Sequence, residues 1–409
     1  MRLKDITILS PQYIGDKIDC DVSFVPMESL RNGNIDYQTI PFNQAKGKYT
    51  YFGNNDLLIA KVTPCFENGN IAIAKNLLNG IGYGSSEIFV LRPNEKLISQ
   101  YLFYLSQSRD FQNKACATMC GVGGLKRISP LFMRTYEVNI PNLKAQERMV
   151  NYLDTKLYEI NTQVSLLTSK RNAYLRLKKS IINHAVTQGL NPEVKMKANG
   201  VDWIGEIPEH WEYKRIKDIS RQVFMGKTPE YTFKKNKNWI FGQRNNQTYG
   251  LDFNDIKYGK DAFFSSRKKF EFLKYGDVLL NTLGGGSVGR VGFYNYKGVE
   301  KVITDGHIMV IRCKGYSEKY LYYFLSTKRN ALEQMAVGST NQSFFNISDI
   351  LILHVPFPPL SEQQAIAAYL DEKCSKIDKI VANLEKQISL YTDMKRSLID
   401  EVITGKRAV

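Results

Sequence analysis

The fold of this chain is decided by a stretch of sequence that occurs twice. Residues 147–186 read ERMVNYLDTKLYEINTQVSLLTSKRNAYLRLKKSIINHAV, and residues 364–403 read QAIAAYLDEKCSKIDKIVANLEKQISLYTDMKRSLIDEVI. In both, apolar side chains recur at alternating spacings of three and four, a period typical of helices that pair along a seam. The expected seam consists of Val150, Leu153, Leu157, Ile160, Val164, Leu167, Tyr174, Ile181, Leu370, Ile377, Val381, Leu384, Ile388, Tyr391 and Leu398.

Three further seam positions are cationic, namely Arg171, Lys178 and Lys395. Two stretches of equal length and phase in one chain favour a helix pair over two helices that each cover a separate globular surface. At about 1.5 Å per residue, such a stretch makes a rod roughly 60 Å long. The first helix leads to a second domain and the second helix returns, so we expect antiparallel rods with a globular domain at either end.

The segments between these helices also repeat. The matched segments, whose offset drifts between 213 and 221 residues, are Arg2–Ile6 and Arg215–Ile219, Asp56–Leu58 and Asp277–Leu279, Ser85–Arg92 and Asp305–Arg312, Tyr104–Ser106 and Phe324–Ser326, and Tyr152–Asp154 and Tyr369–Asp371. A tandem duplication produces two similar domains related by an approximate symmetry. Two such domains can each bind one of two similar ligands, or one of two similar parts of a single ligand.

Within each copy, short apolar runs bounded by Gly, Asn and Pro predict strands that are followed by a helix. We therefore expect an α+β protein with a pseudo-twofold internal repeat, in which two globular domains in tandem are separated by two long helices packed as an antiparallel coiled coil. The expected boundaries are 1–142 for the first domain, 143–189 for the central helix, 190–212 for a linker, 213–358 for the second domain and 359–409 for the C-terminal helix.

The composition excludes several classes of protein. The six cysteines are scattered without the spacing of zinc ligands, and the four histidines lie far apart, so no metal site is expected. No run approaches the roughly 18 apolar residues of a membrane span, and the N-terminus lacks the apolar core of a signal peptide. We therefore expect a cytoplasmic protein that makes no use of a membrane. A net charge of +16 predicts a polyanionic partner.

Candidate DNA contacts follow from side-chain chemistry, because phosphates attract Lys and Arg while base edges suit Arg, Asn and Gln. Residues 214–274 contain 15 basic and 6 acidic residues, which makes this region the most favourable. The alternative for such a charge run is an ordinary solvated surface. The candidates are Lys61, Asn68, Asn70, Lys126 and Arg127 in the first copy, and Lys227, Lys234, Lys235, Lys237, Gln243, Arg244, Asn245, Asn246, Gln247, Arg267, Lys268 and Lys269 in the second.

Three phrases resemble the specificity subunits of Type I restriction-modification systems, and the resemblance covers essentially the whole chain. They are VDWIGEIPEHWE at Val201–Glu212, DLLIAKVTPCFENGNIAIA at Asp56–Ala74, and PPLSEQQ at Pro358–Gln364, of which PNLKAQE at Pro141–Glu147 is a weaker first copy. The resemblance implies two target-recognition domains that read a bipartite, asymmetric site on double-stranded DNA. It also implies that two adenine methyltransferase subunits bind the helices, and it leaves motor/nuclease subunits open as further partners.

The resemblance implies a subunit without catalytic activity. An adenine methyltransferase needs an Asn/Asp-Pro-Pro-aromatic loop, whereas Pro356–Pro359 lacks both the Asn or Asp and the aromatic residue. Gly284, Gly286 and Gly289 match a dinucleotide-binding pattern, but the residues after them predict a strand instead of the helix that would bind phosphates. We expect no catalytic residue and no cofactor. Two alternatives stay open: a scaffold that binds DNA without sequence choice, and a free-standing methyltransferase or nuclease with an unrecognised active site.

Overall fold

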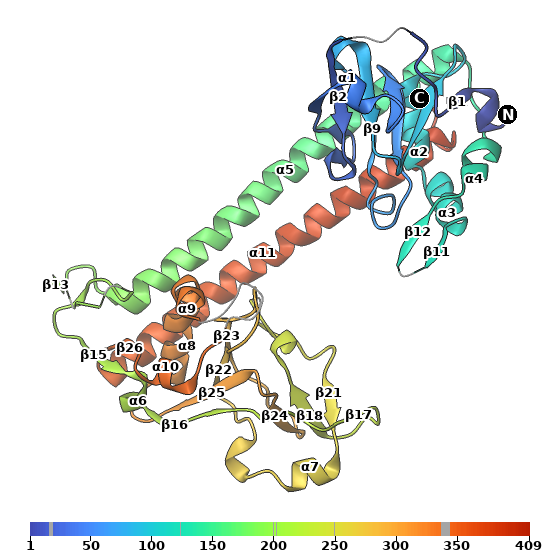
Figure 1. Ribbon diagram of the computed structural model, residues 1–409. Coiled ribbons are helices and arrows are strands. Elements are labelled where there is room, and N and C mark those ends of the chain that lie inside the picture. Colours follow the sequence, from blue (N-terminus) through green and yellow to red (C-terminus); the bar gives the residue numbers. More distant parts are fainter. Residues whose placement is uncertain (16–18, 123, 199, 202, 249, 337–343) are drawn as a thin grey trace. The chain divides into compact units, whose positions relative to one another are not determined.

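The chain divides into two compact units, each of which contains one mixed domain and part of each long helix (Figure 1). The computed structural model describes residues 1–15, 19–122, 124–198, 200–201, 203–248, 250–336 and 344–409. Unit 1 comprises Met1–Ser169 and Leu384–Val409, and unit 2 comprises Lys170–Asn383. The two mixed domains are therefore completed by helical segments that come from distant parts of the chain.

Unit 1 contains two four-stranded sheets. The first has the order β1-β10-β7-β8 and is antiparallel, and the second has the order β5-β2-β9-β6 with a parallel β2–β9 pair. Residues of β7 alternate between two cores: Leu57 and Ile59 face the helices, and Leu58 and Ala60 face the other way. The elements are β1 (Thr7–Leu9), β2 (Asp21–Val25), β5 (Gln38–Pro41), α1 (Phe42–Ala45), β6 (Thr50–Gly53), β7 (Leu57–Ala60), β8 (Ile71–Ile73), β9 (Ile81–Gly84), β10 (Ile88–Pro93), α2 (Ser99–Gln107), α3 (Arg109–Ala117), β11 (Cys120–Val122), β12 (Leu125–Arg127) and α4 (Pro130–Thr135).

Unit 2 repeats this arrangement. Its antiparallel sheet has the order β16-β25-β22-β23, and its second sheet has the order β17-β21-β18-β24 with a parallel β18–β24 pair. The α+β class and the internal repeat are thus confirmed. The elements are β15 (Glu212–Arg215), α6 (Ile216–Ile219), β16 (Ser220–Met225), β17 (Tyr231–Thr232), β18 (Asn238–Phe241), β21 (Lys257–Gly259), α7 (Asp261–Ser265), β22 (Val278–Asn281), β23 (Val291–Phe293), β24 (Lys301–Thr304), β25 (Ile308–Cys313), α8 (Glu318–Thr327), α9 (Arg329–Met335), α10 (Ile347–Leu351) and β26 (His354–Phe357).

An ion pair to a buried aspartate holds the same two strands together in each copy. In unit 1, Arg92 donates to both carboxylate oxygens of Asp56 at 2.8 and 2.7 Å. In unit 2, Arg312 donates to both oxygens of Asp277 at 2.7 and 2.8 Å. The second pair is more deeply buried, and the Arg312 guanidinium also donates to the carbonyl oxygens of two neighbouring loop residues. A buried charge needs such partners, which explains why both residues recur in the repeat.

Each long helix begins beside a fully buried glutamine. The side chain of Gln146 accepts a hydrogen bond from the backbone of Ile98 at 2.9 Å and donates to two backbone carbonyls, both at 2.9 Å. The side chain of Gln363 accepts from the backbone of Ser317 at 2.8 Å and donates to the carbonyl of Pro358 at 2.8 Å. These contacts tie the start of each long helix to the start of α2 or α8.

Two further hydrogen bonds, which join α2 to α5 and α8 to α11, correct one sequence match by a single residue. The hydroxyl of Tyr104 binds the carboxylate of Asp154, and the hydroxyl of Tyr323 donates to that of Asp371 at 2.6 Å. Tyr104 therefore corresponds to Tyr323, and not to Phe324 as the sequence match has it. The match of Tyr104–Ser106 to Phe324–Ser326 gives the wrong register at Tyr104, because α8 is one residue longer than α2.

The two long helices are α5 (Leu143–Gln188) and α11 (Leu360–Ile403), and they pack antiparallel in each unit. In unit 1, Lys395 donates to Asn161 at 3.1 Å, and Arg407, just beyond α11, donates to Tyr152 at 3.3 Å. In unit 2, Lys178 donates to Asp378 at 2.6 Å. Every predicted seam residue is buried or half-buried, and the half-buried ones are Val164, Leu167, Tyr174, Ile181, Ile388 and Tyr391.

Two of the three cationic seam residues occupy equivalent positions in the repeat. An offset of 217 residues relates Lys178 to Lys395 and Asn161 to Asp378. The Lys178–Asp378 ion pair of unit 2 thus corresponds to the Lys395–Asn161 hydrogen bond of unit 1. Burial lowers the pKa of Lys395 below its usual value, because Asn161 offers it no negative charge. Polar seam contacts of this kind favour one register of a helix pair over others.

We predict that Asn161→Asp stabilises unit 1 by about 0.5 kcal/mol, because it supplies the carboxylate that unit 2 already has. Pairing would depress the folded-state pKa of the new carboxyl below its unfolded value of about 3.9. The gain should therefore be present at neutral pH and be lost as the pH falls through that depressed pKa. Urea unfolding of the variant at several pH values measures it, with Asn151→Asp on an exposed part of α5 as the control. Equal stability of variant and parent at neutral pH would contradict the prediction.

Candidate nucleic-acid interface

Three of the predicted cations of the first copy lie together at one edge of unit 1. The backbone of Ile128 donates to the carbonyl of Lys61 at 3.0 Å, and the backbone of Thr63 donates to that of Lys126 at 3.0 Å. The Thr63 hydroxyl also donates to the carbonyl of Gly124 at 2.8 Å. The β11–β12 hairpin is therefore tied to the loop after β7, which brings Lys61, Lys126 and Arg127 onto one surface.

These three cations are not equally available to a phosphate. Arg127 forms a bidentate pair with Glu87 at 2.8 Å, and this hydrogen bond lowers the pKa of the Glu87 carboxyl. The ammonium of Lys61 donates to the carbonyl of Ser86 at 2.6 Å, and burial lowers its pKa. Lys126 is exposed and its side chain has no ion-pair partner among the described residues. Lys126 is thus the cation of this group that is most available to DNA.

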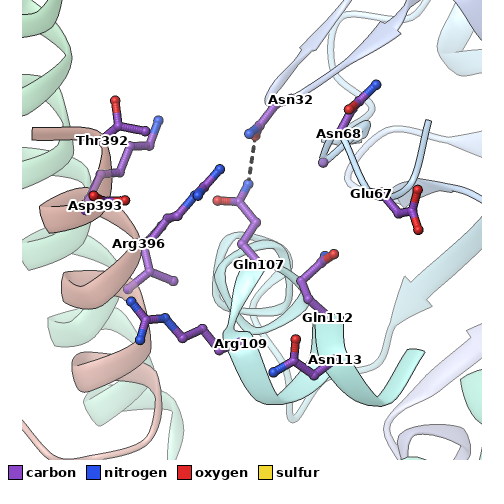
Figure 2. Close-up of a pocket in the computed structure, with 13 residues that line it drawn as sticks. Asn32, Glu67, Asn68, Gln107, Arg109, Gln112, Asn113, Thr392, Asp393 and Arg396 are labelled. Atoms are coloured by element: carbon purple, nitrogen blue, oxygen red, sulfur yellow. Dashed lines mark hydrogen bonds between the residues drawn. The ribbon is translucent and has the colours of Figure 1, made fainter. Parts of the chain in front are cut away.

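The two predicted asparagines of the loop after β7 have different surroundings. The side chain of Asn70 is buried, with 7% of its surface exposed, so it does not reach solvent. Asn68 is exposed and lines a cleft of 640 Å³ (Figure 2). We therefore keep Asn68 as a candidate base reader and remove Asn70. The cleft is lined by Asn32, Glu67, Asn68, Gly69, Gln107, Arg109, Gln112, Asn113, Thr392, Asp393, Lys395, Arg396 and Ile399.

Most polar residues of this cleft were not candidates from the sequence. The cleft lies between a recognition-domain loop, the start of α3 and the last turns of α11, and Figure 2 shows Arg109 and Arg396 reaching into the space between them. Arg109 is fixed to α11, because its side chain donates to Ser397 at 3.2 Å and its backbone donates to Asp400 at 3.1 Å. Arg109 and Arg396 are far apart in sequence and meet only because α11 packs against the first domain.

The predicted base-reading segment of the second copy turns inward. Asn245 and Asn246 are buried, with 3% and 0% of their surfaces exposed. The amide of Asn246 donates to Asn281 at 2.9 Å, and that of Asn245 donates to a backbone carbonyl at 2.9 Å. Contrary to the expectation from the sequence, both amides donate in the interior and are not exposed at the surface, and the buried Asn246 Oδ1 has no hydrogen-bond partner among the described residues. Sequence alone does not separate an interior amide from an exposed one.

The neighbouring candidates are bound to other parts of unit 2. Gln243 donates to a backbone carbonyl at 2.6 Å, and Gln247 accepts from Arg290 at 2.7 Å. Arg244 pairs with Asp255 at 2.7 Å while remaining exposed. Arg267 is half-buried, and the phosphate candidates that are exposed are Lys227, Lys234, Lys235, Lys237, Lys268 and Lys269.

The described residues hold neither a metal-binding cluster nor a phosphate loop followed by a helix. No group of three His, Cys, Asp or Glu side chains among them could hold a metal ion. The loop of Gly284, Gly286 and Gly289 leads into strand β23, so it lacks the helix that a phosphate-binding loop requires. Within the described part of the chain, no helix is long and apolar enough to span a membrane.

A duplicated α+β domain, paired long helices and an edge rich in cations and amides define a class of DNA-binding proteins. The chain belongs to the family described as Type I restriction modification DNA specificity domain, which matches residues 8–166 and 208–390. The match therefore includes both copies of the repeat, about half of α5 and about two thirds of α11.

Individual relatives agree with this assignment. The EcoAI specificity subunit of Escherichia coli is 36% identical over 152 residues, which are 36% of this chain and 26% of the relative. This match spans about a quarter of that relative's length. The MjaVIII specificity subunit of Methanocaldococcus jannaschii is 22% identical over 96% of this chain and 88% of its own. A solved chain described by the words "complex assembly and conformational transition of the type I R-M system" has the same fold, with a TM-score of 0.74, 16% identity and coverage of 98% and 96%.

We predict that Asn246→Ala destabilises unit 2 by about 1–3 kcal/mol, because it leaves the buried oxygen of Asn281 without its donor. The DNA sequence that the protein prefers should not change, since this amide does not reach the surface. Denaturant unfolding and a selection from randomised duplexes check the two parts. The control is Asn254→Ala at an exposed position. A changed sequence preference in a variant of unchanged stability would restore Asn246 as a base reader.

Proposed function

We propose that this chain is the DNA-recognition subunit of a Type I restriction-modification system and has no catalytic activity of its own. The observation that carries the proposal is the family match over both copies of the repeat. The net charge of +16 supports a polyanionic ligand. Each domain reads one half of a bipartite, asymmetric target, and the helices determine the gap between the halves.

The two domains share a scaffold but differ in their loops, which supports two different half-sites. The buried contacts of Gln146 and Gln363 are repeated, whereas the loop residue Asn68 corresponds to the buried Val288 at the offset of 220 residues that relates β8 to β23. The part of the second copy that follows α9, at residues 337–343, lies outside the described residues. Divergence at the surface above a repeated core is what recognition of two sequences requires.

We further propose that two adenine methyltransferase subunits bind the long helices, and that motor/nuclease subunits join this complex. In unit 1, large apolar side chains remain exposed on α5 and α11 away from the seam. They are Tyr158, Leu166, Leu390 and Met394, with 75%, 59%, 58% and 55% of their surfaces exposed. Large exposed apolar side chains on both helices suit a protein partner. Base flipping and methyl transfer belong to that partner.

The first test is the methylated sequence in a host that expresses this chain with an adenine methyltransferase subunit of the same system. We expect methylated adenines in a motif of two different short sequences separated by unspecified bases. The chain expressed without that subunit should leave the DNA unmethylated. A continuous motif, or methylation by the chain alone, would refute the proposal.

The second test lengthens the helix pair. Four residues inserted into α5 between Leu167 and Lys170, and four into α11 between Leu384 and Gln387, extend each helix by about 6 Å and nearly preserve the phase of the seam. Since a base pair rises about 3.4 Å, the gap should grow by about two base pairs while the half-sites stay the same. Four residues inserted at Asn191 in the linker serve as the control. A fixed gap in an active double insertion would show that the helices do not determine the spacing.

A further inference from the structure

The cleft of unit 1 contains a cation that the described contacts leave unpaired. Arg396 is exposed on α11, extends toward Gln107 in Figure 2, and has no hydrogen bond or ion pair to any described residue. Its neighbour Lys395 differs, because it turns into the seam and donates to Asn161 at 3.1 Å. The doublet Lys395–Arg396 thus has one residue that contacts the other long helix and one that faces outward.

The second copy repeats this doublet on the other helix. An offset of 217 residues places Lys178 opposite Lys395 and Lys179 opposite Arg396. Lys178 also turns into the seam, where it pairs with Asp378 at 2.6 Å, and Lys179 is exposed. On both α5 and α11, therefore, the first residue of the doublet contacts the other long helix and the second is exposed.

The exposed residue of the doublet differs between the two copies, and the difference indicates which kind of ligand group it binds. Arg396 in one copy is Lys179 in the other, so the positive charge is retained while the planar guanidinium is not. Bidentate recognition of a base edge requires the guanidinium, whereas a phosphate is satisfied by either cation. The amide of Asn68, which lines the cleft with Arg396, is not retained, because Asn68 corresponds to Val288 at the offset of 220 residues that relates β8 to β23. A phosphate contact would retain its positive charge in both copies, whereas a base contact would differ between them. The retained charge of Arg396 beside the variable amide fits this pattern.

The composition of the cleft supports a DNA strand as its occupant. Its three cations, Arg109, Lys395 and Arg396, outnumber its two acids, Glu67 and Asp393. The remaining polar lining is mainly amide, from Asn32, Asn68, Gln107, Gln112 and Asn113. The Arg109 side chain donates to Ser397 and Lys395 donates to Asn161, both neutral partners, so the cleft keeps its positive charge and Arg396 is the cation whose side chain has no described contact.

We propose that Arg396 and Lys179 each bind a backbone phosphate of the DNA, one beside each half of the target, so that the long helices contact DNA as well as determine spacing. This inference rests on the proposed function and adds to it a named sequence-independent contact. Because phosphate contacts position the duplex without selecting its sequence, these cations hold the DNA in the register that the variable loops then read.

The experiment measures binding of the full-length chain to a target duplex and a scrambled duplex over a range of salt concentrations. Arg396→Gln should weaken binding to both duplexes by the same factor, several-fold at 0.1 M salt, and should reduce the slope of log K against log salt by about 0.9. Lys179→Gln should do the same, and Arg396→Lys should retain nearly full affinity. The control is Lys386→Gln, which removes another exposed cation of α11.

Replacing single phosphates by uncharged methylphosphonates locates the contact. One such replacement should weaken binding of the parent chain but leave binding of Arg396→Gln unchanged. An unaltered affinity and salt slope in Arg396→Gln would overturn the inference. So would a loss confined to the target duplex, which would make Arg396 a base reader, or a loss that appears only with the methyltransferase subunit, which would assign it to a protein contact. A parent chain that does not distinguish target from scrambled DNA would instead refute the proposed function.

Discussion

The structure depends on one constraint: the core of each mixed domain is completed by both long helices. In unit 1, Val150 and Leu153 of α5 share a buried cluster with Leu398 and Val402 of α11 and with the sheet. In unit 2, the equivalent cluster contains Val186 of α5 and residues of α11. Burying one such side chain contributes about 1.5–3 kcal/mol, so neither the domains nor the helices reach full stability separately. Each recognition surface is thereby held rigidly against its own helical segments.

Buried polar contacts explain how one scaffold is kept through duplication while its surface diverges. Gln146 and Gln363 satisfy backbone groups in the same way, and Arg92 and Arg312 each pair with an aspartate. Replacing any of these groups leaves a buried donor or acceptor without a partner, which costs more than most surface changes. Loops such as the one that carries Asn68 are free of this penalty. A repeated interior with variable edges can therefore be adapted to two DNA sequences.

Part of the candidate interface could be predicted from the sequence. Residue chemistry alone selected Lys61, Lys126 and Arg127 as candidates, and the hairpin brings the three onto one surface. Asn245 and Asn246 are the opposite case, because an amide-rich segment next to strands has the same composition whether it faces solvent or the interior. The roles of all these residues in DNA binding stay predictions. Arg109 and Arg396 could not be found from the sequence, since nothing local relates two positions that meet through the packing of α11 on the first domain.

By itself, the sequence determined the duplicated α+β organisation and the two paired helices, because hydrophobic period and repeat length are local properties that survive without coordinates. The family was indicated by the resemblance of the phrases at residues 56–74, 201–212 and 358–364. Only the tertiary structure decided which polar residues are available to a ligand. It placed Asn70 and Asn246 inside, paired Arg127 with Glu87, and left Arg396 unpaired among the described residues. The physical reason is that a polar side chain can satisfy its hydrogen bonds either with water or with a buried partner. That partner is usually distant in sequence, so local sequence does not reveal it.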